Sequence, residues 1–172
     1  LQEGDTTGVF QLESSGMRRY LKELKPTVVS DIIAMVALYR PGPMEFIPKF
    51  IGGKNGTIPV TYLDPCLENS LKDTYGVAVY QEQVMQMARD FAGFSLGQAD
   101  ILRKAVAKKI TDLLAEQKKM FIERAVANGK NAKLAEEVFK FIEPFAGYGF
   151  NRAHATCYGL ISYRTAYLKA HY

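Results

Sequence analysis

The sequence contains few of the residues on which several common kinds of site depend. Its 172 residues include two cysteines, Cys66 and Cys157, and two histidines. Two cysteines cannot build a disulfide framework, and together with two histidines they make no zinc site. So little cysteine fits a reducing, intracellular and therefore cytoplasmic setting. Cys157 lies in an almost uncharged stretch and is predicted to be a buried apolar thiol.

Long apolar runs and catalytic motifs are also missing. The longest strongly apolar run, residues 32–39, is far too short to cross a bilayer, so no membrane partner is expected. The seven aspartates are scattered without an Asp-x-Asp pair, whereas metal-dependent phosphoryl transfer needs converging carboxylates. No P-loop, Gly-x-Ser-x-Gly or His-Glu-x-x-His motif is present. We therefore predict no catalytic residue and no metal site within this segment.

The bulk composition is that of a globular chain. Hydrophobic residues make up 48% and charged residues 23% of the sequence, which allows a sizeable core. The formal net charge of +4 is a mild basic bias that suits an anionic partner. The chain starts at Leu1 and ends within a predicted helix, which suggests a piece of a longer protein.

Helical signals dominate the sequence. Capping residues precede most of the apolar-periodic stretches: Ser14 or Ser15, Ser30-Asp31, Ser95, Thr111-Asp112, Asn131 and Asn151. Two prolines around a glycine at 40–44 rule out helix there, and the helix after Asn131 is expected to end near 144–147. Residues 77–80 fit either a strand or the start of the next helix. We predict a mainly α fold, an irregular domain of about seven helices with little or no sheet.

The segment 101–110 concentrates four basic residues without an acidic one. Lys104 and Lys108 lie four residues apart on one predicted helix face, and Arg103 is beside Lys104. Such a cluster suits a polyphosphate or a nucleic-acid backbone, because each contact is charge-assisted. An ordinary solvated helix face is the alternative interpretation.

The stretch 146–155 is the strongest local signal. It places Tyr148 and Phe150 before the predicted cap Asn151, with Arg152 and His154 in the first turn of the last helix. Aromatic faces beside a cation suit stacking on a nucleobase, and a helix N-terminus favours anions. The alternative is a plain elbow between helices with a buried histidine. The uncharged stretch 153–163 is predicted to be core in either case.

Two further groups are weaker candidates. The rigid turn at 40–44 could present Arg40, although a simple helix stop explains the same pattern. The segment 80–83 aligns Tyr80 with the amides of Gln81 and Gln83, as many exposed helix starts do.

Several blocks together resemble one family, the alpha subunits of bacterial DNA polymerase III, which are C-family replicative DNA polymerases. The resemblance extends from about Gly8 to the last residue, in matching order and spacing. It is carried by TGVFQLESSGM (7–17), ALYRPGPM (37–44), TYGVAVYQEQVMQMA (74–88), AGFSLGQADILRKAVAKK (92–109), NGKNAKLAEEVF (128–139) and FAGYGFNRAHATCYGLISYRTAYLKAHY (145–172).

The resemblance implies that residues 1–172 are part of the fingers domain of a DNA-directed DNA polymerase, with 1–13 a candidate palm-to-fingers junction. The palm, whose three aspartates bind Mg²⁺, would lie upstream, so the fragment alone is expected to be inactive. The implied partners are template-primer DNA, an incoming dNTP, and other holoenzyme subunits, including a sliding clamp bound through regions outside the chain.

The resemblance also implies roles for single residues. Arg103 and Lys104, with Lys108 a weaker candidate, would bind the triphosphate, although the family usually has arginine at 104. The residues expected beside the nascent base pair are Tyr148, Phe150, Arg152 (more often lysine in the family) and His154. Those expected to contact DNA or support the pocket are Arg40, Tyr80, Gln81, Gln83, Lys109 and Asn151. Cys157 replaces a usual alanine, which suggests tight packing there.

Two alternatives remain open from the sequence. The first is a stand-alone helical scaffold or nucleic-acid-binding module with a basic face. The second is an inactive homologue, because the catalytic carboxylates would lie outside the chain. An upstream palm with paired aspartates would favour the polymerase.

Overall fold

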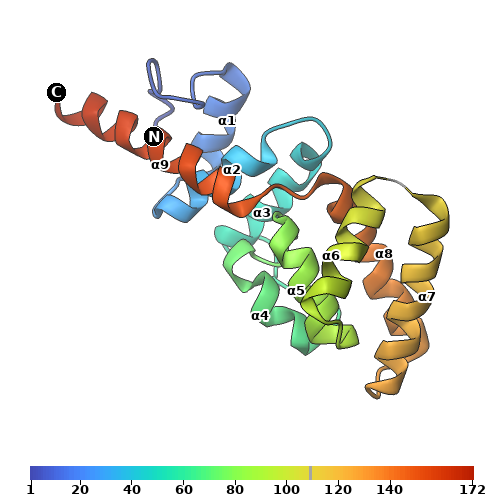
Figure 1. The fold of residues 1–172 in the computed structure, drawn as a ribbon. Coiled ribbons are helices and arrows are strands. Elements are labelled where there is room, and N and C mark those ends of the chain that lie inside the picture. The colour runs from blue at the N-terminus through green and yellow to red at the C-terminus, as the bar shows by residue number, and fades with distance from the viewer. Residues whose placement is uncertain (109) are drawn as a thin grey trace. The chain divides into compact units, whose positions relative to one another are not determined.

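The structure is a computed structural model that describes residues 1–108 and 110–172, with only the backbone described at Ala146. These residues form nine α-helices, three short 3-10 helices and no β-strand, which confirms the predicted mainly α class (Figure 1). The chain divides into two compact units. Unit 1 combines Leu1–Pro59 with Phe150–Tyr172, and unit 2 is Val60–Gly149, so unit 2 is inserted within the sequence of unit 1.

Unit 1 contains four α-helices and one 3-10 helix: α1 (Ser15–Leu24), α2 (Val29–Leu38), η1 (Pro43–Phe46), α3 (Ile47–Lys54) and α9 (Arg152–His171). The Ser14 hydroxyl accepts from the Met17 amide and caps α1, as predicted. Helix α2 begins at Val29, earlier than the predicted cap at residues 30–31. The reason is that the buried Asp31 carboxylate accepts hydrogen bonds from the amides at 27 and 28.

The prediction that residues 40–44 exclude helix is wrong in its second half. Helix α2 does end before this turn, but η1 begins at Pro43. Proline is tolerated at the first helical position, because the amide hydrogen it lacks would have no partner there.

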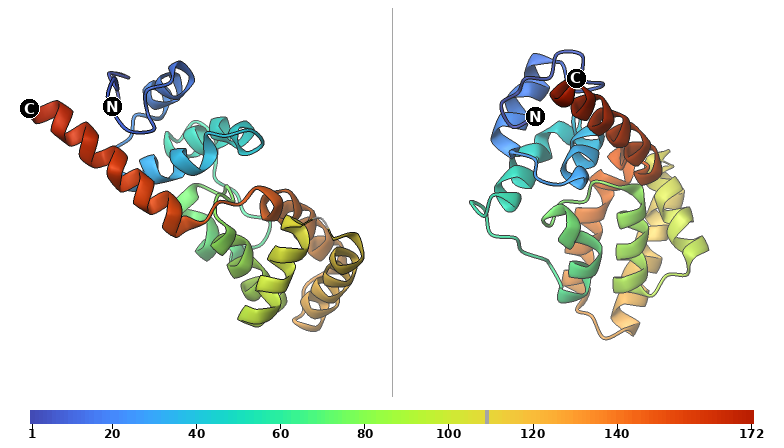
Figure 2. Two further views of the ribbon diagram at one scale, coloured as in Figure 1. Left: turned by 45° about the horizontal axis from the view of Figure 1, so that its top comes forward. Right: turned by 90° about the vertical axis from the view of Figure 1, so that its left-hand side faces the viewer.

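Helix α9 packs along α2 through small residues (Figure 2). Its buried positions are Ala155, Gly159 and Ser162, whereas large side chains such as Leu160 and Ile161 are exposed. The prediction that the whole stretch 153–163 is core is therefore wrong. Small residues let the two backbones approach closely, and the bulky apolar side chains of α9 then point away from α2.

Cys157 is a second correction on α9, because the structure exposes this thiol. It lies between two buried positions of the helix, on a different face from the seam against α2. The predictions that Cys157 is buried and tightly packed are both wrong. As for the rest of residues 153–163, the lack of charged side chains was read as a sign of burial.

Gly159 allows a direct test of the seam between α2 and α9. A Cβ added at Gly159 would lie 2.6 Å from Ile33 Cγ1 and 3.1 Å from the Ile33 Cα, whereas one added at Gly97 in α6 would meet nothing within 4 Å. Alanine is favoured over glycine within helices by about 0.5–1 kcal/mol. We expect Gly97→Ala to raise the free energy of unfolding by that amount and Gly159→Ala to lower it by about 1–3 kcal/mol.

Urea unfolding of the 172-residue chain, with hydrogen exchange resolving the two units, measures this difference. An equal gain in stability from both substitutions would contradict close packing at Gly159.

Unit 2 is built around four longer helices. Its elements are η2 (Pro65–Leu67), α4 (Glu68–Leu71), η3 (Lys72–Thr74), α5 (Gln81–Ala92), α6 (Leu96–Ala107), α7 (Thr111–Ala127) and α8 (Ala132–Tyr148). Helices α7 and α8 form an antiparallel hairpin (Figure 1). The predicted caps Ser95 and Asn131 accept amide hydrogen bonds at the starts of α6 and α8, whereas Thr111 is the first residue of α7.

A cluster of phenylalanines forms the centre of unit 2. The Phe121 ring is fully buried, and its centroid lies 5.5–5.9 Å from those of Phe91, Phe94 and Phe139. These rings come from α5, α7, α8 and the α5–α6 connection. One aromatic side chain of α7 therefore joins the helices of the unit.

Residues 77–80 form neither a strand nor the start of a helix. They are buried and lead into α5, which begins at Gln81. The Gln83 side-chain oxygen accepts from the amides of Val79 and Tyr80, and its amide nitrogen donates to Ser70 O and to Thr74 Oγ1. Hydrogen bonds to one buried glutamine thus help to hold this extended segment in place.

Helix α8 ends within one residue of the predicted range 144–147. Pro144 lies inside the helix, which extends to Tyr148. The rings of Phe141 and Phe145, 5.2 Å apart, make contact across the proline. Proline at this position removes one backbone hydrogen bond from the helix.

Candidate functional site

The predicted basic cluster lies on α6 in unit 2. The Arg103 side chain is 22% exposed and the Lys104 side chain 54% exposed. Lys108 is exposed and follows the last residue of α6, where its backbone amide donates to Lys104 O at 3.0 Å. The buried side of the helix is formed by Ala99, Leu102, Ala105 and Val106. The cations therefore project from a helix that the core of unit 2 holds in place.

Asp100 holds both cations of this pair, although it lies just outside the basic segment and is not among the predicted residues. Its Oδ1 accepts from Arg103 Nε at 3.0 Å and Nη2 at 2.8 Å, and its Oδ2 lies 2.6 Å from Lys104 Nζ. Hydrogen bonds from Lys104 and then from Arg103 hold the pKa of Asp100 below its usual value. An acid three and four residues before the two bases was the signal available in the sequence.

Gln81 approaches the same guanidinium from α5. Its Oε1 lies 3.5 Å from Arg103 Nη1. A Cβ at Gly149 would lie 3.1 Å from both Gln81 Cγ and Gln81 N, and 2.8 Å from Phe145 O. Glycine at 149 thus lets the end of α8 lie against Gln81, as part of the same unit as Arg103.

The other residues predicted from 80–83 and from the end of α8 differ in exposure. Tyr148 is the last residue of α8 and is 43% exposed. Tyr80 and Gln83 are buried, and Gln83 is occupied in holding residues 77–80. Lys109 lies outside the described residues.

The start of α9, in unit 1, is organised as predicted. Asn151 caps the helix, because its side-chain oxygen accepts from the His154 amide at 2.8 Å. Arg152 and His154 both lie exposed in the first turn. The Arg152 carbonyl accepts from Thr156 Oγ1 at 2.8 Å.

A ladder of rings connects this turn with two distant segments of unit 1. The Arg40 guanidinium carbon lies 4.8 Å from the Phe150 ring centroid, and the centroids of Phe150 and His154 are 5.4 Å apart. His154 stacks on Tyr158 at 4.4 Å, and Tyr158 contacts Phe10 at 5.4 Å. Burial lowers the pKa of Arg40. Tyr158 and Phe10 were not predicted as part of this group, although Tyr158 follows His154 at the spacing of one helical turn.

The structure thus brings six of the predicted residues together in two groups. Arg103, Lys104 and Gln81 meet in unit 2, and Arg40, Phe150 and His154 form a ladder in unit 1. Within the described residues, no three histidine, cysteine, aspartate or glutamate side chains are placed to hold a metal ion.

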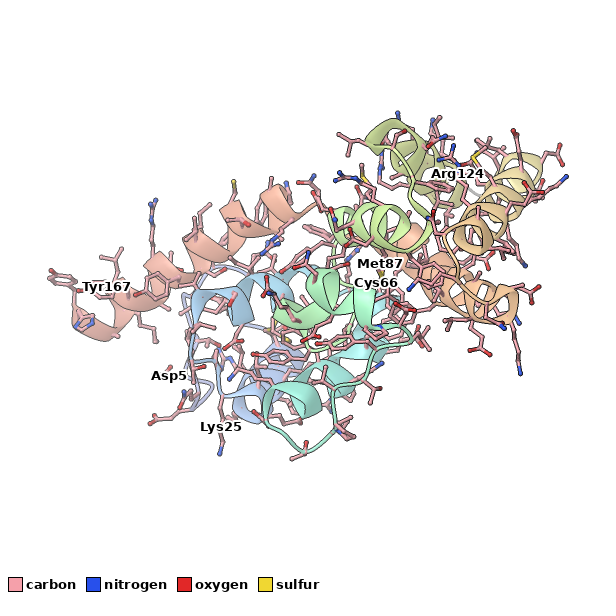
Figure 3. The ribbon with its side chains drawn as sticks, turned by 90° about the horizontal axis from the view of Figure 1, so that it is seen from below. Asp5, Lys25, Cys66, Met87, Arg124 and Tyr167 are labelled. Carbon is pink, nitrogen blue, oxygen red and sulfur yellow. The ribbon has the colours of Figure 1, made fainter. Side chains whose placement is uncertain are left out.

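A third polar cluster, around Asp64, is structural. The Lys130 ammonium donates to both carboxylate oxygens of Asp64, at 2.8 and 2.9 Å, and lies 5.4 Å from the Phe91 ring centroid. Burial and the adjacent Asp64 raise the pKa of the Cys66 thiol to about 12, so this cysteine is protonated at neutral pH. Cys66 belongs to η2 and is labelled in Figure 3. The cluster ties η2 to the turn between α7 and α8.

In the described part of the chain, no helix is both long enough and apolar enough to cross a membrane. The exposed apolar side chains at the end of α9 include Tyr167, which extends away from the ribbon in Figure 3.

Comparison with known proteins gives one consistent family. The family described as the bacterial DNA polymerase III alpha subunit finger domain matches residues 1–129. The DNA polymerase III subunit alpha of Halalkalibacterium halodurans is 56% identical over the whole chain, and that of Bacillus subtilis is 54% identical over the whole chain. The Xylella fastidiosa protein of the same name is 54% identical over 98% of the chain.

The match covers the chain but only part of each relative. The chain spans 15% of the Halalkalibacterium and Bacillus proteins and 14% of the Xylella protein. The α6 cations lie within the finger-domain match, and the start of α9 lies beyond it, in a region that the three relatives still cover. These matches favour the predicted polymerase segment over a stand-alone scaffold. The chain belongs to the bacterial DNA polymerase III alpha subunit family, with its finger domain matched over residues 1–129.

Proposed function

We propose that this chain is the part of a replicative DNA-directed DNA polymerase that binds the triphosphate of the incoming dNTP and borders the nascent base pair. The observation that carries the proposal is the Arg103–Lys104 pair, held by one carboxylate on a helix within the finger-domain match. Charge-assisted donors of this kind suit phosphate oxygens. We further propose that all 172 residues belong to the fingers, with residues 1–13 as a junction to a palm.

The chemistry proposed for the full-length polypeptide is nucleotidyl transfer. The primer 3′-hydroxyl attacks the α-phosphate of the dNTP, the bond to the β-phosphate breaks, and pyrophosphate leaves. Mg²⁺ bound by residues outside this chain would supply Lewis-acid catalysis. Arg103 and Lys104 bind and orient the β- and γ-phosphates, so they neutralise charge on the leaving group.

The proposed partners follow from this role. They are template-primer DNA, a dNTP, and other subunits of a cytoplasmic replication complex, including a sliding clamp bound through regions beyond this chain. The relatives' shared name, DNA polymerase III subunit alpha, supports the DNA and nucleotide substrates.

A binding experiment tests the triphosphate role directly. The affinity of the full-length polypeptide on primed DNA is measured for a dNTP and for the corresponding nucleoside. We expect the triphosphate to supply most of the affinity, and alanine at Arg103 to reduce the advantage of the dNTP over the nucleoside. If the advantage is unchanged in that variant, Arg103 does not bind the triphosphate.

His154→Ala tests the second half of the proposal. The His154 ring stacks on Tyr158 and makes a tilted contact with Phe150, so its loss removes a ring that borders the proposed base-pair pocket. We expect misincorporation or nucleotide discrimination in primer extension to change more than the affinity for primed DNA. A sharp fall in DNA affinity in gel-shift assays, with selectivity unchanged, would contradict this role.

A further inference from the structure

Asp100 is placed to set the geometry of the two cations on α6. Each of its oxygens serves one of them: Oδ1 accepts two hydrogen bonds from Arg103, and Oδ2 lies 2.6 Å from the Lys104 ammonium. The three residues fall within five positions of the same helix, and their relative positions are therefore fixed by the helix itself. One carboxylate thus constrains both side chains.

The arrangement leaves donors on both cations for a ligand. Asp100 accepts hydrogen bonds from Arg103 Nε–H and from one hydrogen of Arg103 Nη2. Gln81 Oε1 lies 3.5 Å from Arg103 Nη1. A guanidinium has five hydrogens, so Nη1 and Nη2 each retain one beyond these contacts. The Lys104 ammonium has three hydrogens, only one of which a single carboxylate oxygen needs, and its side chain is 54% exposed. Asp100 orients the two side chains without using up their donors.

We propose that Asp100 is a positioning residue, which holds Arg103 and Lys104 in the orientation that the β- and γ-phosphates require during nucleotidyl transfer. This inference rests on the proposed function. Two cations and one carboxylate give the group a net charge of +1, and removal of the carboxylate charge makes it +2. Loss of Asp100 would therefore strengthen the attraction for a triphosphate while freeing both side chains to adopt other rotamers.

The expected signature is a separation of kcat from KM. In the full-length polypeptide, Asp100→Asn should leave the KM for the dNTP unchanged or lower it, because electrostatic attraction is kept or increased. It should lower kcat by about ten- to a hundredfold, since small misplacements of groups that act in the transition state have effects of this size. Asp100→Glu, which restores the charge, should recover part of kcat.

Two comparisons make the test specific. Asp112→Asn removes one exposed acid from the start of α7 in the same unit, so it controls for a change in overall charge. On the Arg103→Ala background, Asp100→Asn should have a much smaller effect on kcat than it has alone, because one of its two partners is gone. Circular dichroism of each variant verifies that helix content is retained.

The outcomes separate this inference from the proposed function. If Arg103→Ala lowers kcat/KM but Asp100→Asn behaves like Asp112→Asn, or raises KM with kcat unchanged, Asp100 is not a positioning residue and the proposed function stands. If Arg103→Ala leaves kcat/KM unchanged, the proposed function fails, and this inference fails with it. A fall in kcat with KM not raised, reduced on the Arg103→Ala background, supports Asp100 as a positioning residue.

Discussion

Replacement of Arg103 by alanine in the full-length polypeptide should lower kcat/KM for dNTP incorporation by about ten- to over a hundredfold. The estimate corresponds to one charge-assisted contact of about 1.5–3 kcal/mol in the transition state. Both kinetic constants should change: KM should rise because the ground-state triphosphate loses a ligand, and kcat should fall because charge on the leaving pyrophosphate is less well neutralised. Steady-state primer extension measures both.

The structure supplies two matched variants for this measurement. Arg103→Lys keeps a cation but loses the planar fork that binds phosphate bidentately, so it should lie between the wild type and the alanine variant. Arg89→Ala removes an exposed arginine of α5 whose Nη1 lies 3.3 Å from Gln86 Oε1, and it should change little. Equal kcat/KM for the wild type and Arg103→Ala would refute the phosphate role.

Phe121→Ala should cause the largest loss of stability in unit 2. The side chain is fully buried and packs against three other phenylalanines, so its removal leaves a cavity surrounded by rigid rings. Truncation of a buried phenylalanine typically costs about 3–5 kcal/mol of unfolding free energy. Urea unfolding of the 172-residue chain, followed by circular dichroism, measures the total loss.

Hydrogen exchange of the amides in α5–α8 shows where that loss occurs. We expect protection to fall throughout these helices, because Phe121 joins them at one point. Phe141→Ala is the control, since Phe141 is only partly buried and contacts Phe145 in its own helix. Similar losses from both substitutions would mean that the phenylalanine cluster has no special role in the stability of the unit.

The sequence allowed good prediction of features that depend on local interactions. Ser14, Ser95, Asn131 and Asn151 were predicted as helix caps, and each accepts an amide hydrogen bond two or three residues ahead. Capping is local, because the donor and the acceptor are close in the sequence. The basic face of α6 was predicted for the same reason, since the helical period fixes which of its residues point outward.

Features that depend on which helix packs against which other helix were not predicted. The buried face of α9 consists of small residues because α2 lies close to Gly159, and the sequence does not say which helix packs where. The bond between Lys130 and Asp64 joins positions 66 residues apart. Asp100 was predictable from its spacing to Arg103 and Lys104. It was left out because the basic segment 101–110 begins one position after it.

The insertion of unit 2 within unit 1 has a consequence for the order of folding during synthesis. Helix α2 finds its main partner, α9, only after all of unit 2 has been made, because α9 starts at Arg152. On the ribosome, every residue of unit 2 therefore emerges before unit 1 is complete. The apolar face of α2 that α9 covers stays without this partner until α9 has emerged, and during that time it is open to misfolding or to chaperones.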